Sequence, residues 1–136
     1  MPIVEWDPAK HSVNIQEIDG QHQKLFACLN DLYDAMIEGQ GKAVIGKVLG
    51  DLLNYTVYHF DYEDTLFSRH GYPDAASHRA EHAQFTDQAR ALKQRYDAGQ
   101  IFVTTETLSF LIGWLNNHIL GVDKLYVPFL NAKGVR

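Results

Sequence analysis

The stretch from residue 59 to residue 82, HFDYEDTLFSRHGYPDAASHRAEH, contains two pairs of metal-type side chains on either side of a break. His59 and Glu63 are four residues apart, and so are His78 and His82. Residues four apart share one face of an α-helix and can hold one ion together. The Gly-Tyr-Pro sequence between the pairs ends a helix, because proline cannot continue a helix interior. The stretch therefore predicts two helices joined by a turn, each with a ligand pair.

Apolar residues recur at helical spacing on both sides of this stretch and predict four helices in all. Their expected bounds are about 19–38, 42–69, 75–97 and 105–129. Asp19 and Asp74 are suitable caps, because a carboxylate oxygen can accept an orphan N–H at a helix start. Residues 1–18, with Pro2 and Pro8, show no helical period. Because the connections are short, we expect an all-α fold, an antiparallel up-down-up-down four-helix bundle with an extended N-terminal arm.

Such a bundle places candidate ligands from all four helices at one level. At a rise of about 1.5 Å per residue, the candidates fall within one slab roughly 15 Å thick. They are His22, His59, Glu63, His78, His82, His118 and Asp123. Seven such groups exceed the four ligands of a usual single-zinc site, and this mixture suits iron, zinc, copper or manganese. The pattern therefore predicts two metal ions between the helices.

The spacing of His118 and Asp123 is irregular for a shared helix face. Five residues of regular helix turn their side chains roughly 140° apart. We expect either that Asp123 reaches toward the second ion, or that a π-bulge next to Gly121 turns it inward.

Other polar side chains near these motifs are not expected to be ligands. His11 lies in the arm, and His70 lies at a helix end, where the helix dipole favours positive charge. Asp64 and Glu81 point away from the ligand face at helical spacing, so Glu81 is expected to be solvated. Cys28 is expected to be a buried, inert thiol.

Composition limits the remaining classes of function. The chain has 136 residues, which fits one domain, and a net charge of −5, which argues against nucleic acid as a partner. Its single cysteine permits no internal disulfide, as in a reducing compartment. No signal peptide and no apolar run of about 18 residues is evident, so we expect a cytoplasmic location and no membrane insertion.

Four motifs in order along the chain resemble those of the bacterial hemerythrins. They are Ile18-Asp19-Gly20-Gln21-His22, His59-Phe60-Asp61-Tyr62-Glu63-Asp64, His78-Arg79-Ala80-Glu81-His82 and His118-Ile119-Leu120-Gly121-Val122-Asp123. Trp6-Asp7 and Gly113-Trp114-Leu115 also match, so the resemblance spans residues 1–136 as one hemerythrin-like domain. One departure is Asp64, where the family often has a second Glu.

The resemblance implies two non-haem iron ions and O2 as their ligand. By similarity, His78, His82 and His118 would hold one iron. His22 and His59 would hold the other and leave it an open position for O2. Glu63, Asp123 and an oxo or hydroxo group would bridge the two ions.

Reversible O2 binding also needs a dry pocket over that open position. Candidates for its wall are the large side chains Leu25, Phe60, Trp114, Leu115 and Ile119, although each alone is also typical of an ordinary core. The leading hypothesis is a non-enzymatic O2 carrier or store, with an oxygen-consuming protein as recipient. The alternatives are a di-iron redox enzyme (an oxidase, a peroxidase or a nitric-oxide-handling enzyme) and an oxygen or redox sensor. The sequence has no Glu-x-x-His motif, which counts against the oxidase.

Overall fold

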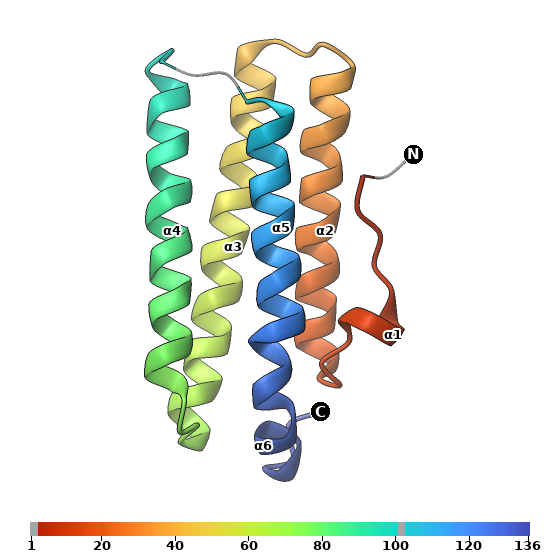
Figure 1. The fold of residues 1–136 in the computed structure, drawn as a ribbon, viewed down its shortest axis with the longest axis vertical. Coiled ribbons are helices and arrows are strands. Elements are labelled where there is room, and N and C mark those ends of the chain that lie inside the picture. Colours follow the sequence, from red (N-terminus) through yellow and green to blue (C-terminus); the bar gives the residue numbers. More distant parts are fainter. Residues whose placement is uncertain (1–2, 101–102) are drawn as a thin grey trace.

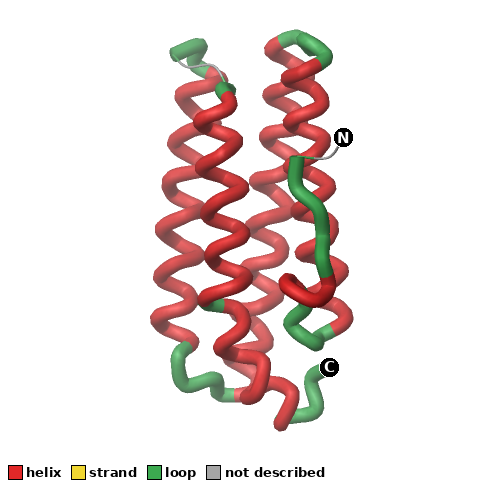
Figure 2. Tube along the Cα trace, turned by 45° about the vertical axis from the view of Figure 1, so that its right-hand side comes forward, coloured by secondary structure: helices red, strands yellow, loops and turns green. Residues whose placement is uncertain are grey.

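A computed structural model of the chain describes residues 3–100 and 103–136. Four long helices run up, down, up and down side by side (Figure 1). They are α2 (Gln16–Ile37), α3 (Lys42–His70), α4 (Ala75–Asp97) and α5 (Thr105–Gly121). The predicted all-α bundle is confirmed, and the described residues contain no strand (Figure 2).

The helix ends at the turns follow from local chemistry. Gly71 caps α3 in the left-handed conformation, with φ 69°, and its N–H donates to the carbonyl of Phe67. A left-handed backbone is strained for residues with a Cβ, so glycine suits this position. At the start of α5, the Thr104 side chain accepts a hydrogen bond from the backbone N–H of Thr107. Asp74 precedes α4, but its side chain makes no capping hydrogen bond.

The N-terminal arm is less extended than the sequence predicts. It contains a short helix, α1 (Pro8–His11), whose first turn is capped by the side chain of Asp7. Helix α2 then begins at Gln16, before the expected cap Asp19. The carboxylate of Asp19 instead accepts hydrogen bonds from the arm, at 2.8 Å from the N–H of Val13 and 2.6 Å from a serine hydroxyl. Asp19 therefore ties the arm to the bundle, and its predicted role as a cap was wrong.

The fourth helix also ends earlier than expected. Helix α5 stops at Gly121 and is followed by the 3₁₀ helix η1 (Asp123–Tyr126) and the short helix α6 (Val127–Ala132). The prediction of one helix to residue 129 overlooked Pro128, which lacks an N–H and clashes with the carbonyl four residues earlier in a continuous helix. The break is decisive for the site, because it begins next to Asp123.

The core consists of two apolar clusters on either side of the predicted ligands. The larger cluster contains Leu25 of α2 and Phe60 of α3, and it continues toward the far end of the bundle. The smaller one contains Ile18, Leu66 and Tyr126, from the end where α1, η1 and α6 lie (Figure 1). On α2 and α3 the two clusters are interrupted where the histidines occur. The ligand layer therefore lies between them and away from solvent.

Candidate metal centre

All seven predicted ligands are buried at one level of the bundle. Three have no exposed surface, and the others are exposed by 3% or less. They come from α2 (His22), α3 (His59 and Glu63), α4 (His78 and His82), α5 (His118) and the first residue of η1 (Asp123). The ligand-type atoms form two groups, each with all members within 4.8 Å of one another. One group is Glu63, His78, His82, His118 and Asp123, and the other is His22, His59, Glu63 and Asp123.

Within each group the imidazole Nε2 atoms face the centre at ligand spacing. Nε2 of His22 lies 3.0 Å from Nε2 of His59. Nε2 of His82 lies 3.1 Å from Nε2 of His118. At a metal–nitrogen bond length of about 2.1 Å, two ligands at a right angle lie about 3 Å apart. The spacing of both pairs therefore suits two ligands of one ion.

The two carboxylates belong to both groups. Oδ1 of Asp123 lies 3.0 Å from Nε2 of His78 and 3.0 Å from Nε2 of His118. Its other oxygen, Oδ2, lies 3.2 Å from Nε2 of His22. Oε1 of Glu63 lies 3.2 Å from Nε2 of His82 and 3.4 Å from Nε2 of His59. Each carboxylate therefore reaches both positions where an ion can lie.

The break after α5 explains how Asp123 reaches the centre. Val122, with φ −112° and ψ −50°, departs from ideal α-helical values and is the residue just before η1. This change redirects Asp123 inward, where it has no exposed surface. The expected π-bulge is absent from this segment, since α5 ends at Gly121 instead. The alternative expectation was that Asp123 reaches only toward the second ion. Its two oxygens instead contact histidines of both groups.

The donor atoms at the centre fit cations. Among the described residues, buried atoms without a hydrogen-bond partner include Glu63 Oε1, His78 Nε2 and both Asp123 carboxylate oxygens. Burying an unpaired polar or charged group is costly, so such a cluster needs compensation. Ions between the two groups would satisfy these atoms at once. The donor set of imidazole and carboxylate suits divalent transition metals.

The protonation states of His59 and Asp123 also favour metal binding. Burial lowers the pKa of His59 to about 4, so its ring is neutral at physiological pH. Burial acts to raise the pKa of Asp123, but attraction to His118 and contacts with other histidines hold it well below its ordinary value. Burial acts to lower the pKa of His78, yet contacts with Asp123 and Glu63 raise it to about 9. A metal ion would displace that proton, because ligands bind in their deprotonated form.

A second layer of side chains holds the ligands in place, and sequence reasoning missed most of it. Gln21 accepts a hydrogen bond from Nδ1 of His59 at 2.7 Å, and its own Nε2 donates to a neighbouring glutamate. The hydroxyl of Tyr126 donates to Oε2 of Glu63 at 2.6 Å. Gln21 directly precedes the predicted ligand His22 in the sequence, and this position could have suggested a role beside the site. Tyr126 had no such signal, because it depends on the path of η1.

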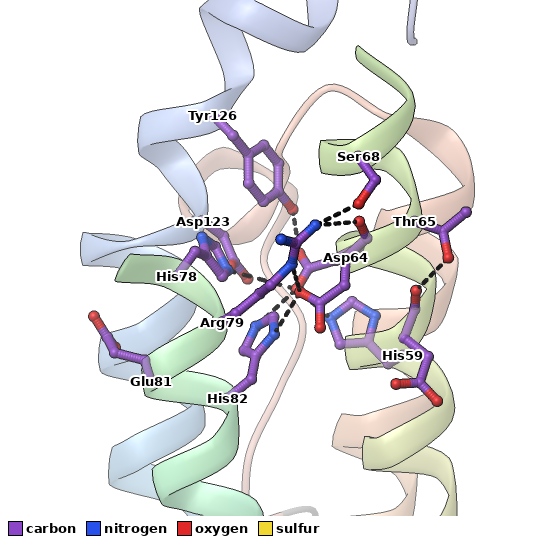
Figure 3. Close-up of polar contacts among 12 residues, drawn as sticks. His59, Asp64, Thr65, Ser68, His78, Arg79, Glu81, His82, Asp123 and Tyr126 are labelled. Atoms are coloured by element: carbon purple, nitrogen blue, oxygen red, sulfur yellow. Dashed lines mark hydrogen bonds and ion pairs between the residues drawn. The ribbon is translucent and has the colours of Figure 1, made fainter. Parts of the chain in front are cut away.

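Two acidic residues that were expected to point away contact ligands instead. Oε1 of Glu81 lies 3.2 Å from Nδ1 of His118, and Oδ1 of Asp64 lies 3.3 Å from Nδ1 of His82. The expectation considered only the helix on which each residue lies. Glu81 on α4 reaches a predicted ligand on α5. Asp64 on α3 reaches His82 on α4 (Figure 3). The side chain of Glu81 is 41% exposed, in line with the prediction of a solvated residue, but that prediction missed its contact with His118.

A sequence profile described as the hemerythrin HHE cation binding domain matches residues 13–130. The chain belongs to the hemerythrin family. Its relatives include a bacteriohemerythrin of Methylococcus capsulatus, 38% identical over 97% of this chain and 100% of the relative. A hemerythrin-like protein of Naegleria gruberi is 33% identical over 89% of this chain and 88% of the relative. A wild-type hemerythrin crystal structure superposes with a TM-score of 0.89 at 37% identity, covering 93% of this chain and 96% of the other.

The candidate pocket residues of this hemerythrin occupy two environments. Leu25, Leu115 and Ile119 are buried in the larger apolar cluster. The ring of Phe60 stacks on His82, with centroids 3.8 Å apart, and the half-buried Trp114 stacks on His118 at 4.5 Å. Both of these aromatic rings therefore pack most closely on the three-histidine group, and the ring of Phe60 also lies 5.9 Å from that of His59. Trp6 of the arm, which sequence reasoning did not select, has its ring 6.4 Å from that of His22.

The remaining histidines of this hemerythrin lie outside both ligand groups. His11 is buried, but Nδ1 accepts a hydrogen bond from the N–H of Asp7 and Nε2 lies 3.1 Å from the side-chain oxygen of Asn116. His70 is the last residue of α3. Cys28 is buried as expected, and burial raises the pKa of its thiol. In the part of the chain that the structure describes, no helix is long and apolar enough to cross a membrane.

Proposed function

We propose that this hemerythrin binds O2 reversibly at two non-haem iron ions and acts as an oxygen carrier or store. The observation that carries the proposal is the pair of shared carboxylates, Glu63 and Asp123, between two groups of ligand atoms. Two ions held so closely act on one small ligand together. Bound as ferrous ions, they would supply the reversible two-electron chemistry that O2 requires.

The side chains divide the work at this centre. His78, His82 and His118 fill one position, whereas the other has only His22 and His59 besides the carboxylates. The second position therefore has room for an external ligand. Glu63 and Asp123 would bridge the ions together with an oxo or hydroxo group. Tyr126 holds one oxygen of Glu63 and leaves the other to face the centre.

The balance of donors favours binding over further oxidation. The set contains five imidazoles, which are neutral donors when they bind a metal, and only two carboxylates. Anionic donors are the ones that stabilise highly oxidised iron. Leu25, Leu115 and Ile119 present apolar surface near the ligand layer and would keep water away from the open position. We therefore propose a binding role, with an oxygen-consuming protein as recipient, rather than an enzymatic one.

An optical experiment tests this role. The iron-loaded protein is reduced without air, O2 is admitted, and the visible absorption is followed while vacuum is applied. A band that forms with O2 and disappears under vacuum through repeated cycles supports the proposal. His59→Ala should abolish the band, and His70→Ala is the matched control that should retain it. A band that decays irreversibly in every cycle would exclude a carrier.

A further inference from the structure

The outer nitrogens of the ligand histidines have different partners in the two groups. In the three-histidine group, Nδ1 of His82 lies 3.3 Å from the carboxylate of Asp64, and Nδ1 of His118 lies 3.2 Å from that of Glu81. In the two-histidine group, Nδ1 of His59 lies 2.7 Å from the amide oxygen of Gln21. Nδ1 of His22, the remaining member, is buried without a hydrogen-bond partner among the described residues. One group therefore has two anionic partners, and the other has one neutral partner.

These partners determine which nitrogen is free to bind metal. A carboxylate can only accept, so contact with Asp64 or Glu81 places the ring proton on Nδ1 and leaves the Nε2 lone pair for an ion. An anionic partner also makes the imidazole a stronger donor than a neutral amide does. His82 and His118 should therefore bind an ion more tightly than His59 and His22.

Asp64 is held in place for this contact. The guanidinium of Arg79 donates to the backbone carbonyl of Asp64 at 3.1 Å and to the hydroxyl of Ser68. Its Nε lies 3.8 Å from Oδ1 of Asp64, farther than Nδ1 of His82. Oδ1 of Asp64 and Nδ1 of His82 are both buried, lie 3.3 Å apart and make no hydrogen bond to any other residue in the described part of the chain. Figure 3 shows Arg79 and Asp64 beside His82, on the outer side of the ligand layer.

We propose that Asp64 and Glu81 are positioning residues that make the three-histidine position the tighter of the two metal positions. The chain then loads iron in a fixed order, first between His78, His82 and His118 and then between His22 and His59. The second position also releases its ion first. This inference rests on the proposed di-iron site and adds an order to it.

The number of ligands alone would also make one position tighter, so the test must change only the outer partners. The metal-free protein is titrated with ferrous iron in the absence of air, in competition with a chelator, and two binding steps are resolved. Asp64→Asn and Glu81→Gln should each weaken the first step by about 10- to 100-fold, the effect of losing an outer partner of a ligand, and leave the second unchanged. Gln21→Glu should strengthen the second binding step and so reduce the difference in affinity between the two steps.

The controls separate positioning from general damage. Asp61→Asn removes a charge from the exposed side of α3, two residues from both His59 and Glu63, and should change neither step. A variant that only loosens the fold would weaken both steps together, and Glu81→Gln, at a partly exposed side chain, is the safeguard if Asp64→Asn folds poorly. Unchanged steps in Glu81→Gln, or equal weakening of both, would overturn the inference. A chain that binds no iron would instead contradict the proposed function.

Discussion

The two ends of the bundle follow different rules. At the far end, buried residues such as Leu32, Leu49 and Leu108 form an uninterrupted apolar core between regular helices. At the ligand end, the core is divided by a buried polar layer, and the chain adds α1, η1 and α6 around it (Figure 1). The far end needs only periodic apolar residues. The ligand end also uses irregular backbone, because Asp123 reaches the centre from the first residue of η1, after α5 has ended.

The largest contrast between the ends should come from removing a shared carboxylate. Asp123→Asn keeps the shape of the side chain but takes away the negative charge that faces both groups. Iron content, measured by elemental analysis after loading, should fall to half or less, because removing an ion's charged partner leaves the remaining donors poorly balanced. Replacing His11 and His70 together by Ala should leave iron content unchanged. A drop to half in that control would make one of them a ligand.

A cavity at the far end should lower the stability of the fold and leave iron binding unchanged. Leu49→Ala removes a fully buried side chain from the larger cluster. It should lower the free energy of unfolding by about 2–5 kcal/mol, as large-to-small core substitutions do. Iron content and O2 binding should stay normal, since no ligand contact changes. Chemical denaturation and iron analysis on the same sample check both parts. Loss of iron in the folded variant would show that the ends are not independent.

Tyr126→Phe makes a smaller change at the ligand end. It removes the hydroxyl that donates to Oε2 of Glu63 and leaves a buried carboxylate oxygen without its donor. The metal-free protein should lose about 1.5–3 kcal/mol of stability, the range for hydrogen bonds to charged groups. Tyr72→Phe, in the same apolar cluster, is the matched control. Equal losses in the two variants would mean that the hydrogen bond to Glu63 has no special weight.

The smallest expected effect concerns the apolar wall. Leu115→Ala should admit water near the open position and speed the irreversible decay of the O2-loaded protein, on the order of tenfold, which is about 1.4 kcal/mol in the barrier. Leu108→Ala is the same substitution in the same cluster, but nearer the start of α5 and farther from the ligand layer, so it should leave the decay rate unchanged. The absorbance of the O2-loaded protein followed over time measures both. An unchanged decay rate in Leu115→Ala would show that this residue is not part of the apolar wall.

Sequence reasoning predicted the helices of the far end and the grouping of the candidate ligands, because both depend on periodicity. Apolar spacing predicted the long helices, and Gly71 fixed the turn that brings His59 and His78 together. The fold of the chain and the level of the ligands followed from antiparallel packing. These features need only helical geometry and the order of residues along the chain.

The irregular parts required the structure. The turn of Asp123 depends on where α5 ends, and the sequence signals near that break were Gly121 and Pro128. The contacts of Asp64 and Glu81 with ligands join different helices, so they depend on how neighbouring helices are rotated. A helical wheel of one segment cannot show such contacts. These are the same features that distinguish the ligand end from the far end.

We infer that two shared carboxylates make one O2-binding centre from two iron positions. The stoichiometry of O2 uptake is the most direct test of this inference. The reduced, iron-loaded protein is titrated with O2 in a closed cell with an oxygen electrode, and the gas is then removed. We expect uptake of one O2 for each pair of irons, and full release of the same amount when the gas is removed. Continuous consumption of O2, or uptake in proportion to single irons, would contradict it.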